Sequence, residues 1–146
     1  MKIKRAETSD IQWIAGELRV FSDSLNTKYS YVPPTQESLH QELQSYVDNH
    51  VLLVAWDDGE RAGVIGGTCT NHPFNSGVTV LALQFWWVPE RRRGSKIGYL
   101  LLRDFLTIGK DYNIVTCGFM DKGIVDPKVF DGMGFSFREI AYVMEN

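Results

Sequence analysis

Apolar residues in the first third of the chain recur at the three- and four-residue spacing of helices. The first predicted helix follows the N-cap candidates at residues 8–10 and extends to about residue 26. Its apolar stripe consists of Ile11, Ile14, Leu18, Phe21 and Leu25. A second helix is predicted from the N-cap Thr35 to about Asn49. Residues 26–34 form a loop in this prediction because Pro33-Pro34 cannot continue a helix.

Strand-like runs precede the first helix and follow the second. The predicted strands lie at residues 2–6, 51–56, 61–70, 78–88, 113–120 and 135–144. Asp58-Gly59 predicts a tight hairpin between two of them, and a second turn is expected at residues 71–77. The run at 78–88 is so apolar and aromatic that it predicts a central strand with no solvated face. Further helices are predicted at 97–109 and, shorter, at 127–133.

The order of these elements predicts an α+β fold. Hairpin connections make most of the sheet antiparallel, whereas a helical crossover makes the strands at 78–88 and 113–120 parallel to each other. The mixed sheet is expected to be flanked by helices in a single domain of residues 1–146. A ligand is expected beyond the carboxyl ends of the parallel strands, where the helix at 97–109 begins.

Composition narrows the function classes. With 44% hydrophobic and 23% charged residues, the 146-residue chain has the composition of a globular protein. A formal net charge of -3 argues against a nucleic-acid or membrane-surface binder. Cys69 and Cys117 are too few for a disulfide framework or a zinc site, so we expect inert thiols and no metal. No apolar stretch in the sequence reaches the length of a signal-peptide core or a membrane span, so we expect a cytoplasmic protein.

A basic, glycine-containing segment connects the strand at 78–88 to the helix at 97–109. A helix N-terminus offers free N–H groups and a positive dipole end to an anion. Gly94 and Gly98 allow the backbone to approach a ligand closely, and Arg93 and Lys96 add positive charge. The spacing matches neither the Walker sequence nor the dinucleotide fingerprint. The segment therefore predicts a pyrophosphate-binding loop of another kind.

The same segment resembles a known family signature. Val88-Pro89-Glu90 followed by Arg93-Gly94-Ser95-Lys96-Ile97-Gly98 resembles the V-x-P…Q/R-x-x-G-x-G/A signature of the GNAT N-acetyltransferase superfamily. The predicted order of strands and helices also resembles that superfamily from end to end. More narrowly, His72-Pro73-Phe74, the run at 86–90 and Gly134-Phe135 are similar to uncharacterised GNAT acetyltransferases of bacteria and phages.

This resemblance implies acetyl-CoA as the cofactor. The residues implied to contact it are Trp86, Trp87, Val88, Arg93, Gly94, Ser95, Lys96, Ile97 and Gly98. The backbone of Val88 would pair with the pantetheine, and the amides of residues 93–98 would hold the pyrophosphate. The sequence departs from the signature at Lys96, which replaces the central glycine. Either the loop is reshaped there, or the lysine itself reaches a phosphate.

The catalytic and acceptor residues are less fully specified. Phe130 stands where many family members carry the tyrosine that protonates the leaving thiolate. Gln84 lies near the usual glutamate base, but an amide only orients an amine or a water molecule. Asp121 is a candidate carboxylate at the end of the strand at 113–120. Tyr29 and Tyr31 come from the loop that borders the acceptor site in this family, and they are candidate substrate contacts for a cationic amine.

Most of these residues also have a structural interpretation. Trp86 and Trp87 alternate across the sheet, which favours packing in the core. Asp121 fits a solvated turn residue, and the two tyrosines fit a cover over the helix ends. His72 is expected to cap its own turn, at the opposite end of the sheet from the anion loop.

The resulting hypothesis is an N-acetyltransferase that moves an acetyl group from acetyl-CoA to a primary amine in a ternary complex. The acceptor is a small molecule or a protein. The alternative is a non-catalytic module on the same fold that binds acyl-CoA or a protein partner. No nucleic-acid or membrane partner is expected, and the exposed edge of the closing strand favours a homodimer.

Overall fold

The computed structural model describes residues 1–25, 27–118, 126–137 and 144. Its strands are β1 Lys2–Arg5, β2 Val51–Asp57, β3 Glu60–His72, β4 Asn75–Trp87 and β5 Ile114–Cys117. Its helices are α1 Ile11–Ser24, α2 Gln36–Asn49, α3 Ile97–Gly109 and α4 Lys128–Asp131. Short 3-10 turns, Thr8–Asp10 and Glu90–Arg92, precede α1 and the segment leading to α3.

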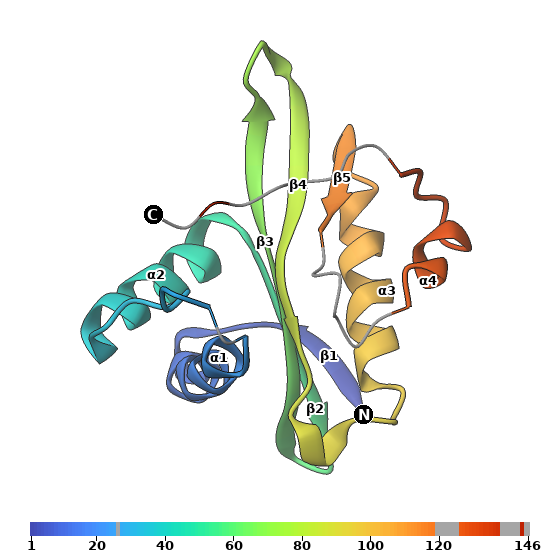
Figure 1. The fold of residues 1–146 in the computed structure, drawn as a ribbon. Helices are drawn as coiled ribbons and strands as arrows, with labels where there is room; N and C mark the ends of the chain where they lie inside the picture. Colours follow the sequence, from blue (N-terminus) through green and yellow to red (C-terminus); the bar gives the residue numbers. More distant parts are fainter. Residues whose placement is uncertain (26, 119–125, 138–143, 145–146) are drawn as a thin grey trace.

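The described strands form one sheet in the order β1-β2-β3-β4-β5. The first four are antiparallel neighbours, and β5 is parallel to β4. In Figure 1, α1 and α2 cover one face of this sheet, while α3 and α4 lie against the other. The predicted α+β fold with a parallel strand pair is therefore confirmed.

The core has two layers because β2 contributes side chains to both faces of the sheet. Leu52 and Val54 pack against α1 and α2, whereas Val51, Leu53 and Ala55 pack with α3. These five residues are all buried. The alternation follows directly from the two-residue period of a strand.

The prediction that residues 78–88 have no solvated face was wrong. In β4 only Leu81 and Trp87 are buried, and Gln84 is exposed. The strand at the middle of the described sheet order is β3. The strand that is buried on both faces is β2, because helices cover both sides of it. The β3–β4 hairpin, by contrast, extends past the helices (Figure 1).

Local sequence signals explain the helix starts and the tight turn. Thr35 Oγ1 accepts a hydrogen bond from the Ser38 N–H at 3.1 Å and caps α2, as predicted. Ahead of α1, Asp10 accepts a bond from the Glu7 N–H at 2.9 Å. Asp58 and Gly59 have φ of 50° and 80°, the left-handed conformation that a two-residue hairpin needs.

Some boundaries differ from the predicted ones. The second turn is shorter than residues 71–77, because β3 continues to His72 and β4 begins at Asn75. Strand β5 is shorter than 113–120, although residues 119 and 120 lie outside the described part. Of the predicted closing strand at 135–144, only 135–137 and 144 are described, and none of these is in a strand. No helix in the described ranges is long and apolar enough to cross a membrane.

Candidate active site

Strands β4 and β5 pair over only part of β4. The parallel ladder joins Val80–Leu83 to Ile114–Cys117, so the residues of β4 after Leu83 have no β5 partner among the described residues. At the same point the register between β3 and β4 shifts: Gly67 faces Leu83 and Gly66 faces Phe85. The extra residue is Gln84, which makes this a β-bulge. The described pairing of β4 with β5 therefore ends at Leu83, on the side of the sheet where a ligand is expected.

Gln84, the predicted catalytic amide, lies at this bulge. Its side chain is exposed, and its Nε2 donates a hydrogen bond to Thr68 Oγ1 on β3 at 3.0 Å. The bond to Thr68 leaves the amide oxygen as the group that can accept a hydrogen bond from a substrate.

The loop between β4 and α3, residues 88–96, presents free backbone donors. A 3-10 turn, Glu90–Arg92, leads to Gly94, whose φ of 78° is left-handed. Ser95 Oγ then donates to the Arg92 carbonyl at 2.7 Å and accepts a long bond from the Ile97 N–H at 3.4 Å. Within the described ranges, the N–H groups of Gly94, Lys96 and Gly98 have no acceptor. These donors at a helix N-terminus suit a diphosphate anion.

Lys96 fits this loop without distorting it. Its φ of -74° and ψ of -2° are ordinary helical values, so the position requires no glycine. The loop therefore does not have to be reshaped to accommodate lysine in place of the signature glycine. The other explanation, that the lysine side chain reaches a phosphate, stays a prediction. Gly98, by contrast, is closely packed, because a Cβ there would lie 3.3 Å from the Trp86 ring.

The four cations of the loop have different surroundings. Arg92 is paired with Asp57 and Glu60, at 3.3 and 2.7 Å. The Arg93 guanidinium lies 4.6 Å from the centre of the Trp87 ring, and its Nε donates to the Val88 carbonyl at 3.1 Å. Lys96 and Arg91 are exposed and have no ion pair with any described residue.

The carbonyl of Val88 is therefore already engaged by Arg93. A carbonyl oxygen has two lone pairs, so that of Val88 can still accept a second hydrogen bond from the pantetheine that the resemblance assigns to this backbone. The sequence could not show the contact between Arg93 and Val88, because it depends on the fold of residues 88–93.

The two tryptophans that precede the loop lie on opposite faces of β4. Trp87 packs with α1 and α2, and its indole N–H donates to Glu17 Oε2 at 2.9 Å. Trp86 packs beside the α3 cluster. Its Nε1 is buried and has no hydrogen-bond partner in the described part of the chain. Both rings thus have the packing role that the alternation predicted.

A hollow of about 630 Å³ lies between α1 and the β4–α3 loop. It is lined by Glu17, Val20, Ser24, Trp87, Pro89, Glu90, Arg91 and Arg93. Carboxylates and guanidinium groups both contribute to this lining, beside aromatic and apolar side chains. Glu17 precedes Leu18 of the apolar stripe and belongs to no sequence motif, so the sequence alone did not indicate that it lines this hollow.

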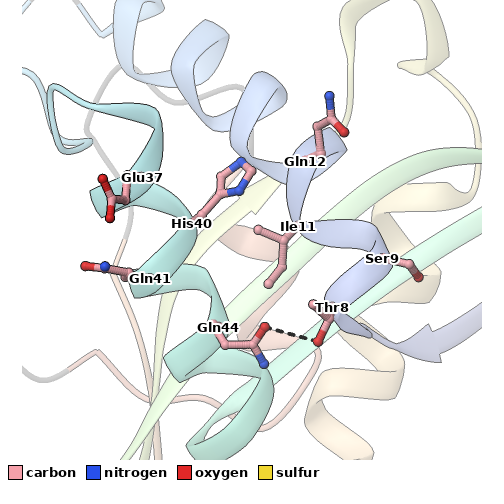
Figure 2. A pocket seen from close by; sticks show the side chains of 8 residues that line it. All are labelled: Thr8, Ser9, Ile11, Gln12, Glu37, His40, Gln41 and Gln44. Carbon is pink, nitrogen blue, oxygen red and sulfur yellow. Dashed lines mark hydrogen bonds between the residues drawn. The ribbon is translucent and has the colours of Figure 1, made fainter.

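A second hollow, of about 540 Å³, lies between the start of α1 and α2. Figure 2 shows its polar lining, in which Thr8 Oγ1 donates to Gln44 Oε1 at 3.1 Å. Glu37, His40 and Gln41 line it from α2. None of the predicted site residues belongs to this hollow.

The other predicted residues are not brought together by the described structure. Tyr29 and Tyr31 are each 53% exposed in the α1–α2 loop, and the ammonium of Lys28 lies 5.3 Å from the Tyr29 ring centre. Tyr31 is fixed to the end of α1, because its N–H donates to Ser22 Oγ at 2.9 Å. Asp121 lies outside the described residues.

Phe130, at the usual position of the acid, is buried and contacts Phe135 edge-on. Burial raises the pKa of the Cys117 thiol to about 11, so this group at the end of β5 is protonated at neutral pH, as expected of an inert thiol. His72 accepts a hydrogen bond from the Phe74 N–H at 3.3 Å, which confirms the predicted cap of its turn.

Asp57, the last residue of β2, lies beside the β4–α3 loop. In the structure its carboxylate lies 3.3 Å from Arg92 Nη1 and 3.8 Å from the N-terminal amine of Met1. It therefore stabilises the loop rather than facing it as a free carboxylate. Asp57 and Arg92 are 35 positions apart, so no local pattern could have revealed the pair.

A family model described as the acetyltransferase (GNAT) family matches residues 18–123. No curated protein matches the sequence significantly. Among solved structures, a ribosomal-protein-alanine N-acetyltransferase from Brucella melitensis biovar Abortus 2308 superposes with a TM-score of 0.77 at 15% identity, over 99% of this chain and 98% of that one.

Two further structures are similar over their whole length. A probable acetyltransferase has a TM-score of 0.78 at 18% identity, covering 100% of this chain and 99% of that one. A transcriptional regulator from Bacillus halodurans C-125 has a TM-score of 0.79 at 17% identity, covering 99% of both chains. At these identities the likeness concerns the fold and leaves the substrates of the present chain open.

Proposed function

The chain belongs to the acetyltransferase (GNAT) family, and from this premise we propose that it transfers the acetyl group of acetyl-CoA to a primary amine. The observation that carries the proposal is the β4–α3 loop. It combines N–H groups without an acceptor in the described structure at the start of α3, the left-handed Gly94 and the exposed Lys96. It also stands at the end of the sheet where β4 continues beyond its pairing with β5.

The loop residues fit the donor as follows. The N–H groups of Gly94, Lys96 and Gly98 donate to the pyrophosphate, and the exposed side chains of Arg93 and Lys96 supply positive charge.

Bound acetyl-CoA supplies a thioester whose acyl carbon is open to attack by an amine. The protein contributes mainly position, because holding two reactants together lowers the barrier without a strong acid or base. Gln84 accepts a hydrogen bond from the amine through its Oε1 while Nε2 stays with Thr68. As the C–N bond forms, the C–S bond of the thioester breaks and CoA leaves as the thiolate. Since the amide of Gln84 cannot take the proton of the amine, a water molecule or a carboxylate receives it.

The acceptor is proposed to be a cationic amine bound near α1 and the α1–α2 loop. The hollow beside α1 is lined by the carboxylates of Glu17 and Glu90 and by the guanidinium groups of Arg91 and Arg93, and the two carboxylates are the groups that attract an ammonium group. Tyr29 and Tyr31 remain the proposed aromatic contacts. Tyr31→Ala is expected to raise the KM for the amine and leave the affinity for acetyl-CoA nearly unchanged. Unchanged amine kinetics, or preference for an anionic acceptor, would exclude this location.

A second candidate function is binding of acyl-CoA without turnover. It is favoured by Phe130, which has no hydroxyl to protonate a thiolate and is buried in the core. It is also favoured by Gln84, which has no acid–base chemistry. Both functions share the donor loop and differ only in the reaction.

The experiment that separates them follows CoA release from acetyl-CoA with a thiol reagent, in the presence of amino acids, polyamines, aminoglycosides and peptides. An acetyltransferase releases CoA at a rate that depends on one of these amines and saturates with its concentration. Binding of acetyl-CoA without amine-dependent release would favour the binding module.

A further inference from the structure

We infer that Arg92 is a positioning residue that holds the β4–α3 loop in its anion-binding conformation through ion pairs with the β2–β3 turn. This inference rests on the proposed function, since the loop is proposed to bind the pyrophosphate of acetyl-CoA. Arg92 itself is not a phosphate ligand in this assignment. In Figure 1 the β2–β3 turn and the loop after β4 lie together at one end of the sheet.

The side chain of Arg92 connects the loop to two carboxylates on a different hairpin. Its Nη1 lies 3.3 Å from Asp57 Oδ2 and its Nη2 lies 2.7 Å from Glu60 Oε2. Asp57 and Glu60 are cross-strand partners on either side of the left-handed Asp58-Gly59 turn. Because that turn is fixed by the β2–β3 ladder, it is a rigid anchor for the guanidinium.

The backbone of Arg92 transmits this anchoring to the start of α3. Its N–H donates to the Pro89 carbonyl at 2.8 Å, which closes the 3-10 turn. Its carbonyl accepts a hydrogen bond from Ser95 Oγ at 2.7 Å, and Ser95 Oγ in turn accepts the Ile97 N–H at 3.4 Å. Contacts therefore run from the hairpin through Arg92 and Ser95 to the first residue of α3.

The alternative is that Arg92 binds a phosphate directly, as its place in a run of three arginines suggests. Its surroundings argue against this, because its side chain is 23% exposed and already engages two carboxylates. Exposed ion pairs contribute little to stability in general. The role assigned here therefore concerns the conformation of the loop more than the stability of the fold.

The two possibilities predict opposite effects when the carboxylates are neutralised. In a purely electrostatic view, removing two negative charges near the loop strengthens the binding of an anion. It also releases Arg92 to contact a phosphate. If the carboxylates hold the loop through Arg92, the double variant Asp57→Asn/Glu60→Gln binds CoA more weakly in spite of its more favourable charge.

The test measures the affinity for CoA by calorimetry in four proteins: wild type, Arg92→Ala, Asp57→Asn/Glu60→Gln, and the triple variant. We expect both Arg92→Ala and the double variant to bind about two- to fivefold more weakly, the scale of partly exposed ion pairs. The triple variant should be no weaker than Arg92→Ala, because the three side chains act as a unit. Arg92→Lys should recover part of the affinity.

Arg61→Ala is the matched control. Arg61 also forms an arginine–carboxylate pair on β3, with its Nε 2.7 Å from Asp10 Oδ1. It belongs to the packing of the segment before α1 and not to the loop. We expect this variant to be less stable to urea than wild type and to bind CoA with wild-type affinity.

Hydrogen exchange of the ligand-free protein tests the positioning separately from the proposed function. The N–H groups of Arg92 and Arg93 donate to the carbonyls of Pro89 and Glu90, at 2.8 and 3.1 Å. We expect faster exchange of the Arg93 amide in the Asp57→Asn/Glu60→Gln variant and no change in Arg61→Ala. Failure of wild type to bind CoA, combined with this change in exchange, would refute the proposed function while keeping the anchoring.

Three results would overturn the inference. One is tighter CoA binding by the double variant, which would identify charge as the dominant effect. Another is a loss of affinity in the triple variant that equals the sum of the losses in Arg92→Ala and the double variant. The third is unchanged exchange of the Arg93 amide in the double variant.

Discussion

Replacing Gly94 by alanine separates the conformation of the β4–α3 loop from its charge. Gly94 has a φ of 78°, and a Cβ at this position would have no heavy atom within 4 Å. The substitution therefore introduces no steric clash. Its effect comes from the free energy that alanine needs to adopt the left-handed backbone conformation. For a residue with a Cβ this cost is about 1–2 kcal/mol.

Without ligand, the loop of Gly94→Ala relaxes to a conformation of lower free energy. The variant must then return to the left-handed conformation to bind CoA, and the free energy of this step is subtracted from the binding free energy. A penalty of about 1–2 kcal/mol corresponds to CoA binding that is weaker by about five- to thirtyfold. Calorimetric titration with CoA measures this change, and urea unfolding shows whether the fold is intact. Gly94→Asn should lose less, since asparagine tolerates the left-handed region better.

Gly134→Ala is the control for this experiment. Gly134 has a φ of 84°, and a Cβ there would likewise have no heavy atom within 4 Å. It follows α4, where hydrogen bonds to the helix end fix the backbone. We expect a loss of stability of about 1–2 kcal/mol and unchanged CoA affinity. Wild-type affinity in Gly94→Ala, or equal loss of affinity in both variants, would refute the assigned role of the loop.

Three further predictions concern the scaffold. Burial raises the pKa of Cys117 from 9.0 to about 11, so the folded protein favours the neutral thiol. The free energy of unfolding should therefore fall as the pH rises from about 9 to about 11. Urea titrations should show a smaller fall over this pH range in Cys117→Ala. Gly67→Ala places a Cβ 2.6 Å from the Phe105 ring and should cost about 1–3 kcal/mol of unfolding free energy, whereas an unchanged urea midpoint would contradict this packing. Thr35→Ala removes the acceptor of the Ser38 N–H and should cost about 1 kcal/mol, with Thr35→Ser as the nearly neutral comparison in thermal unfolding.

The sequence predicted the elements whose signals are local. The Thr35 cap, the Asp58-Gly59 turn and the helix from Ile97 to Gly109 all follow from residues within a few positions of one another. The parallel pairing of β4 with β5 was also predictable, because a helical crossover leaves little other choice.

Burial along the strands was not predictable from local hydrophobicity. Residues 78–88 are more aromatic than 51–57, yet it is β2 that lies between two layers of helices. Which strand is covered on both faces depends on where the helices pack. That information is in the tertiary structure and not in the strand itself.

The candidate site was predicted in its location and less well in its contacts. The loop at 88–96 and Gln84 were identified from the sequence, whereas the β-bulge at Gln84 depends on the register with β3. Trp87 is hydrogen-bonded to Glu17, and Arg92 forms ion pairs with Asp57 and Glu60. These pairs join distant parts of the chain, so residue spacing gave no sign of them.

Calorimetric titration of the protein with acetyl-CoA tests the central claim most directly. The account predicts saturable binding of one acetyl-CoA per chain, weakened in Lys96→Ala by about tenfold because one charge-assisted hydrogen bond is lost. The absence of detectable binding at millimolar acetyl-CoA would contradict the account.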